Sequence, residues 1–320
     1  MRRRSLPRLQ ATVLAVVALA LAATGCGGDD SSAGDDNPRS LLATAAAKPI
    51  ESADVTLRTD ADIPGFPILG ERLVMTGSGP VVMNGPDALP SLDWKVELRA
   101  GGQSFPARLT AVDGRVFVEF MSVPYEADPK LIERLGIGDG AAGGPAGASL
   151  KQLGIDPDGW LRNTKVSDGE EIGGDSTRVV TGTVDKQAVI DDLLAVVDTD
   201  AVREQLDSAG GDGEGLPELG EGGVDEIADA IEDVEVEVNV DDDGYPRRVF
   251  AELRFVVPKD VKDTAIEGGT VTFELVLDQV GDVTVDVQPP VDPDPLASLI
   301  KFAGVIFGVE ELSDLWRTPR

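Results

Sequence analysis

Cys26 is the only cysteine in this chain of 320 residues, and histidine is absent. A catalytic thiol normally needs a neighbouring base, and histidine is the commonest base as well as the commonest ligand of transition metals. A pair of carboxylates could hydrolyse glycosides, but only 4% of the residues are aromatic, which is few for a sugar-binding site. The composition therefore favours a protein that is not an enzyme, and it predicts no cofactor and no metal ion.

The sequence before Cys26 has the organisation of a secretory signal. Several arginines near the start precede an apolar run over residues 11–23, which is shorter than the about 20 residues of a membrane-spanning helix. The Ala-Thr-Gly directly before Cys26 resembles the bacterial lipobox, although alanine stands where leucine is usual. The resemblance implies that residues 1–25 are a lipoprotein signal peptide and that lipid on Cys26 anchors the protein to the extracytoplasmic face of the cell membrane. The alternative is a secreted protein whose cysteine is incidental.

The charge of the chain limits its partners. It has 28 basic against 58 acidic residues, a formal net charge of −30. Nucleic acid is bound by surfaces rich in lysine and arginine, so the charge argues against it as a partner. The same excess of acid disfavours electrostatic binding to anionic headgroups. Contact with the membrane would therefore depend on the lipid on Cys26.

Hydropathy patterns indicate a strand-rich domain. Residues 26–39 are polar and predict a disordered, lipidated tether, after which Ser40 is a candidate N-cap for a helix that ends at Pro49. From Ala53 onward, apolar and polar residues alternate, which is typical of antiparallel strands with one buried face. The segments with this alternation include 93–100, 115–120, 234–240, 249–255 and 271–277, and the acidic residues 241–244 predict a solvated hairpin turn.

Three segments, 128–136, 185–197 and 224–234, have helical spacing, and two segments rich in glycine and acidic residues, 136–149 and 207–223, predict loops. Together the patterns predict an α+β domain over residues 40–290: a large curled antiparallel sheet, or half-barrel, of nine or ten strands with helices across its concave side. Residues 291–320 predict an apolar helical extension that packs as a final core or lid element. A gate, a membrane-dipping segment and a partner surface are the alternatives for this extension.

The order of these features resembles the LppX/LprA/LprF/LprG-type lipoproteins of actinobacterial envelopes. Residues 41–61 resemble the opening helix and first strand of that family, 109–129 a strand led by Asp-Gly with a tyrosine-containing segment, 154–185 the middle section, and 271–290 the closing strands. The family implies a half-barrel that encloses a cavity for lipids or lipoglycans and carries them away from the membrane. LolA/LolB-type carriers share this architecture. The long loops and residues 291–320 depart from the family pattern.

A concave aliphatic face suits acyl chains, which need dispersion contacts and exclusion of water but few polar partners. We therefore expect an envelope lipoprotein that holds the acyl chains of a lipid or glycolipid in an apolar cavity. The candidate wall residues are Val55, Leu57, Trp94, Val96 and Leu98. The same alternation would also serve an ordinary packed core, in which case the protein would be a surface scaffold or sensor that binds an envelope protein partner.

Overall fold

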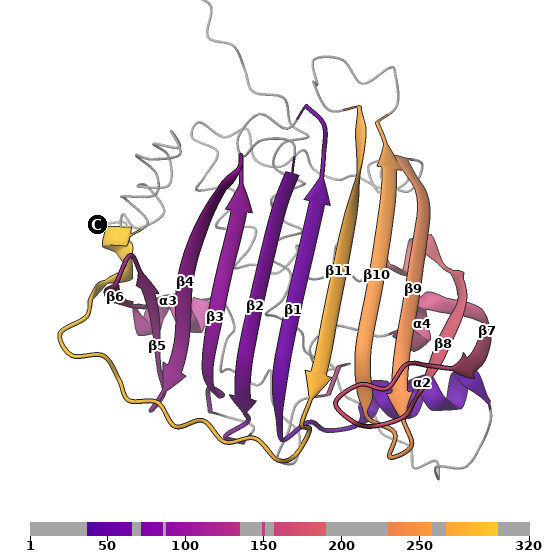
Figure 1. The fold of residues 1–320 in the computed structure, drawn as a ribbon, viewed down its shortest axis with the longest axis horizontal. Helices are drawn as coiled ribbons and strands as arrows, with labels where there is room; N and C mark the ends of the chain where they lie inside the picture. Colours follow the sequence, from indigo (N-terminus) through magenta and orange to yellow (C-terminus); the bar gives the residue numbers. More distant parts are fainter. Residues whose placement is uncertain are drawn as a thin grey trace, which may run out of the picture.

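The computed structural model describes residues 37–65, 72–85, 88–134, 149–150, 157–189, 230–257 and 267–299. These residues form one large open antiparallel sheet with a few short helices (Figure 1). The predicted α+β half-barrel is confirmed.

The described part of the chain contributes twelve strands. In chain order they are β1 (Ser52–Asp62), β2 (Arg72–Val82), β3 (Ser91–Ala100), β4 (Gln103–Val112), β5 (Arg115–Phe120), β6 (Val123–Glu126), β7 (Leu161–Asp168), β8 (Thr177–Val184), β9 (Ile231–Asp241), β10 (Pro246–Val256), β11 (Gly268–Asp278) and β12 (Asp294–Pro295). Their spatial order is β12-β6-β5-β4-β3-β2-β1-β11-β10-β9-β8-β7. Neighbouring strands are antiparallel, except that β12 runs parallel to β6. The sheet thus consists of two meanders, β1 to β6 and β7 to β11, which the β1–β11 pair joins.

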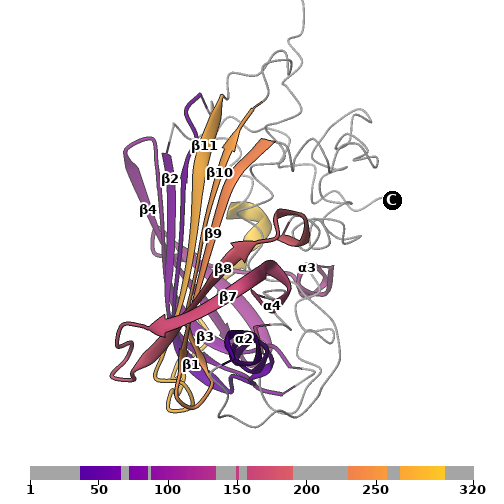
Figure 2. The same cartoon turned by 90° about the vertical axis from the view of Figure 1, so that its right-hand side faces the viewer.

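The sheet curls, and the helices lie on its concave side (Figure 2). α2 (Pro38–Ala47) packs against β7, β9 and α4 (Pro157–Trp160), and α3 (Pro129–Arg134) follows β6. The residues that α2 buries recur at helical spacing and so share one face; they are Leu41, Leu42, Ala45 and Ala46. Within the described residues, no helix is long and apolar enough to cross a membrane.

α2 begins earlier than the sequence predicted. Its N-cap is Asn37, whose side chain accepts a hydrogen bond from the Arg39 N–H at 3.1 Å, and Pro38 lies in the first turn. Proline fits there because its missing N–H would have no partner within the helix. Ser40 lies inside the helix, where its carbonyl accepts a hydrogen bond from the Thr44 hydroxyl. The prediction of Ser40 as the N-cap was therefore wrong.

The prediction of a helix over 224–234 is wrong for its C-terminal residues. Ile231 already belongs to β9 and pairs with Phe255 of β10, so the partner strand extends β9 back beyond the valine alternation. Of the predicted helix over 185–197, residues 186–189 are helical, Asp185 lies just before the helix, and residues 190–197 lie outside the described residues. The predicted signal peptide, most of the tether, nearly all of both predicted loops and residues 300–320 also lie outside them.

The strand register aligns side chains into rows on each face of the sheet. One row on the concave face crosses ten strands from β5 to β7; it comprises Phe120, Ala107, Val96, Gly77, Leu57, Leu275, Val249, Val238, Val180 and Val166. No residue of this row has a polar side chain. A neighbouring row on the convex face places Lys95, Arg108 and Glu119 side by side. The faces therefore differ sharply in polarity.

The two halves of the concave face differ in burial. On β1 and the second meander, inward side chains such as Leu57 and Val238 are buried in one core cluster together with Leu42 of α2. On β2 to β5 the larger inward side chains are only half-buried, although Ala100 and Ala111 are buried. The half-buried residues include Met75, Trp94, Val96, Leu98, Leu109, Val118 and Phe120. α2 therefore fills one half of the concave face and leaves the half on β2 to β5 less completely covered.

Candidate functional site

The five predicted wall residues lie on the same face of the sheet. Val55 and Leu57 come from β1, and the other three come from β3. Leu57 pairs with Gly77 of β2, and Gly77 pairs with Val96 of β3, so the two groups are one strand apart on the concave face. The structure therefore brings the predicted residues together.

The five predicted wall residues differ in how deeply they are buried. Val55 and Leu57 are 8% and 7% exposed and belong to the core cluster that contains the α2 residues. Val96 and Leu98 are half-buried on the less covered half of the face. Trp94 is also half-buried and packs against the core cluster. The five residues thus span the boundary between the packed half and the less covered half of the concave face.

Gly77 provides the space that Trp94 occupies at this boundary. A Cβ added at Gly77 would lie 3.2 Å from Trp94 Cε3 and 4.0 Å from Val96 Cγ2. The indole of Trp94 therefore extends from β3 across the backbone of β2, where a side chain would otherwise stand. This arrangement fixes the ring between the two halves of the concave face.

The Trp94 indole carries a polar group that the structure leaves without a partner. Its Nε1 is shielded from solvent and makes no hydrogen bond within the described part of the chain. A buried indole N–H usually finds an acceptor, and an unpaired buried donor costs about 1–3 kcal/mol. The sequence identified Trp94 as an apolar wall residue, but it gave no sign that the N–H would be left unpaired.

The convex face carries ion pairs in place of apolar side chains. Arg108 binds Asp93 through two hydrogen bonds of 2.5 and 2.6 Å, and Arg72 binds Asp60 through two of 2.9 and 2.7 Å. Hydrogen bonds from the Arg108 guanidinium hold the pKa of Asp93 below its ordinary value, and Arg72 lowers the pKa of Asp60 in the same way. These carboxylates are therefore charged partners of arginine and are poorly suited to act as general acids at neutral pH.

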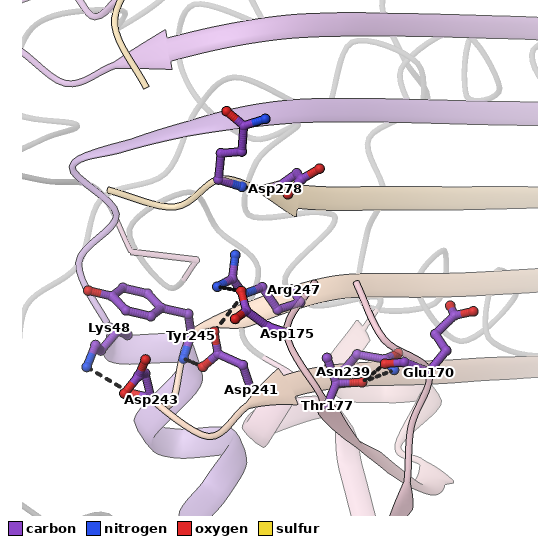
Figure 3. Close-up of polar contacts among 11 residues, drawn as sticks. Lys48, Glu170, Asp175, Thr177, Asn239, Asp241, Asp243, Tyr245, Arg247 and Asp278 are labelled. Carbon is purple, nitrogen blue, oxygen red and sulfur yellow. Dashed lines mark hydrogen bonds and ion pairs between the residues drawn. The ribbon is translucent and has the colours of Figure 1, made fainter. Parts of the chain in front are cut away.

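A buried polar cluster lies at the β9–β10 hairpin (Figure 3). Arg247 donates to Asp241 at 2.6 Å and also to Asp175 of the β7–β8 loop. Its side chain is 7% exposed and that of Asp241 is 3% exposed. Asp241 also accepts a hydrogen bond from the Tyr245 N–H at 2.8 Å. The prediction that residues 241–244 form a hairpin turn is confirmed, but Asp241 is buried and pairs with Arg247 and is not solvated as the sequence predicted.

Further contacts hold the β7–β8 loop, residues 169–176, against the sheet. Asn239 donates to the Thr177 hydroxyl at 3.0 Å, and that hydroxyl donates to the carbonyl oxygen of Glu170 at 2.6 Å. Gly173 has a φ of 64°, and a Cβ there would overlap the carboxylate of Asp278 on β11. The loop therefore contacts the ends of β9, β10 and β11, and we interpret this cluster as one that stabilises the fold.

The described residues offer no metal site, because they contain no group of three or more acidic, cysteine or histidine side chains that could hold an ion. Cys26 lies outside the described residues, so its predicted acylation stays a prediction.

Comparisons with known proteins add little. No protein-family model matches the chain, and no curated protein matches it significantly. Among solved structures, the chain is similar to the crystal structure of LprF from Mycobacterium bovis, with 13% sequence identity and a TM-score of 0.35. The similarity covers 81% of this chain and 100% of the LprF chain. It is weak, it concerns the fold at most, and no conclusion about a ligand follows from it.

Proposed function

We propose that this protein is a cell-envelope lipoprotein that binds the acyl chains of a lipid or glycolipid against the concave face of its sheet. The observation that supports the proposal best is the apolar row across ten strands, with half-buried side chains over β2 to β5. A face of this kind offers dispersion contacts and excludes water without requiring a polar partner at each position.

The affinity available from such a face is large. Each CH₂ group removed from water contributes about 0.8 kcal/mol, so a chain of about 16 carbons gains about 12 kcal/mol before the cost of ordering it. No covalent chemistry is needed, and the protein acts as a carrier or shelter between envelope layers and not as an enzyme. The large, aliphatic and curled surface is suited to such a role.

The anchor in this proposal is lipid on Cys26. The chain from Cys26 to the N-cap residue Asn37 can span at most about 40 Å when fully extended, so the half-barrel would stay close to the outer surface of the membrane. A Cys26→Ser variant should appear in the soluble fraction, while the wild type fractionates with membranes. Equal membrane association of the two would contradict the anchor and leave the lipid-binding proposal to be judged separately.

The test of lipid binding compares native, delipidated and relipidated protein. We expect mass spectrometry of the native protein to detect bound lipid, and relipidation at about 100 times the dissociation constant to add about 2.7 kcal/mol to the free energy of unfolding. Two adjacent residues of β3 provide matched variants: Val96→Asn places an amide on the concave face, and Lys95→Asn places it on the convex face. Binding should weaken only in Val96→Asn. No lipid in native protein, together with no thermal shift on relipidation, would refute the proposal.

A second candidate function has one observation in its favour. α2 already fills one half of the concave face, as a scaffold or sensor with a fully packed core would require. Such a protein would use its charged convex face to bind an envelope protein partner. If delipidated protein keeps the full stability of the native protein, the scaffold or sensor is favoured over the carrier.

A further inference from the structure

The unpaired N–H of Trp94 stands out among apolar neighbours. In its own row, Leu109 of β4 lies directly beside it and Val118 of β5 follows before Tyr125 of β6, and the next row on the concave face contains no polar side chain. A phenylalanine would fill much of the same space over Gly77 without leaving a buried donor. The indole therefore places a buried, unpaired donor at this site, which costs stability.

The ring is held so that it does not turn to find a partner within the protein. The backbone of β2 at Gly77 lies against Cε3 and Cζ3 of the ring, and the ring also packs against the core cluster. Because Nε1 is already shielded from water, an acceptor can reach it only after a ligand displaces the atoms that cover it.

We infer that Trp94 is a specificity-determining residue, whose Nε1 donates a hydrogen bond to the carbonyl oxygen of an ester-linked acyl chain. This inference rests on the proposed lipid-binding function. The chain would lie along the inward side chains of β3 and β4, including Val96, Leu98 and Leu109. The Trp94 N–H would then gain the partner that it lacks in the structure.

The surroundings of Trp94 select a neutral acceptor. The inward neighbours of the indole on the described strands carry no positive charge, so the carboxylate of a free fatty acid would be buried there without a counter-ion. An ester carbonyl accepts the same hydrogen bond without this cost. An alkyl ether keeps only an oxygen within the chain, which is less accessible to the indole N–H than a projecting carbonyl oxygen, and a hydrocarbon has no acceptor at all. The ether therefore pairs the N–H less well than the ester, and the hydrocarbon leaves it unpaired.

The test compares three probes on delipidated full-length protein: dipalmitoylglycerol, its dihexadecyl ether analogue, and palmitate. We expect the ester to bind about tenfold more tightly than the ether, which corresponds to one hydrogen bond in an apolar site, and palmitate to bind most weakly. The ester should also move the indole ¹⁵N–¹H resonance of Trp94 downfield. The resonance of Trp160, which packs against the same cluster, is the internal control.

Variants separate this inference from the proposed function. Trp94→Phe should bind ester and ether equally, whereas Trp160→Phe should keep the preference for the ester. Equal binding of ester and ether to the wild type, or a Trp94 resonance that the ester does not move, would overturn the inference and leave acyl-chain binding intact. Failure of ester and ether alike to bind would refute the proposed function as well. The resonance of the wild-type protein decides the matter even if Trp94→Phe does not fold.

Discussion

Replacement of Arg247 by methionine should destabilise the protein far more than replacement of its neighbour Arg248. Arg247 lies between two carboxylates of unequal exposure: the side chain of Asp175 is 51% exposed, whereas that of Asp241 is 3% exposed. Without Arg247, Asp175 can be hydrated, but Asp241 keeps a buried charge with one remaining side-chain hydrogen bond, from the Tyr245 N–H. The loss of stability therefore comes mainly from the buried, unpaired carboxylate of Asp241.

The expected magnitude follows from this burial. Removal of one partner of a buried ion pair costs about 3–5 kcal/mol, and the remaining hydrogen bond to Asp241 favours the lower end of that range. For a domain of this size the melting temperature should fall by about 6–12 °C. Arg248 is 21% exposed and pairs with Glu274, which is 33% exposed, so Arg248→Met should cost at most about 1 kcal/mol.

Urea unfolding followed by circular dichroism, with calorimetry for the melting temperature, measures both variants. A second change, Asp241→Asn, made in the Arg247→Met background, should recover more than half of the loss because it removes the unpaired charge. The reasoning would be refuted if Arg247→Met and Arg248→Met differed by less than about 1 kcal/mol, or if Asp241→Asn destabilised the Arg247→Met protein further.

Three further outcomes are expected. Arg108→Gln should raise the pKa of Asp93 in an NMR titration. Because the folded pKa of Asp93 is lowered in the wild type, the Arg108–Asp93 pair stabilises the fold at neutral pH, by about 0.5–1 kcal/mol for this partly exposed pair. This stabilisation disappears as the pH falls through the folded pKa of Asp93. Equal stability of variant and wild type at pH 7 would contradict this. Gly79→Ala should cost about 3 kcal/mol in urea unfolding, because its φ is +152° and a Cβ would overlap the Asp93 carbonyl oxygen; a loss below about 1 kcal/mol would show that β2 can adjust. Gly77→Val should displace the indole of Trp94, change the tryptophan fluorescence and remove the preference for ester lipids, so unchanged fluorescence would contradict the placement of the ring.

The sheet could be predicted from the sequence because the signal is local. In β3, the inward residues Trp94, Val96 and Leu98 alternate with residues of the charged face, and this period of two appears within one segment. The shared face of the candidate residues follows from the same alternation. The packing of α2 over one half of the concave face could not be predicted, because the period of β1 is the same whether a helix or a ligand covers it.

Burial that depends on distant segments was not predictable either. Asp241 belongs to an acidic turn in the sequence, yet in the structure it is buried and paired with Arg247, which also binds Asp175 of the β7–β8 loop. Phe117 lies on the convex face, whereas Val118 and Phe120 of the same strand lie on the concave face. Phe117 is nevertheless only 1% exposed. The guanidinium carbon of Arg115 lies 4.8 Å from the centre of its ring, a contact that the alternation along β5 does not reveal.

The pairing of β1 with β11 has a consequence for how the chain folds. Each meander can form from contacts between consecutive strands, but the seam between them joins Leu57 to Leu275, near opposite ends of the described sequence. Pairing across so long a stretch of chain is slow, because the entropy of a large loop is lost before the new contacts form. Until β11 has been synthesised, the free edge of β1 is open to pairing with other chains. The growing polypeptide thus depends on β11, the last long strand among the described residues, for protection against aggregation.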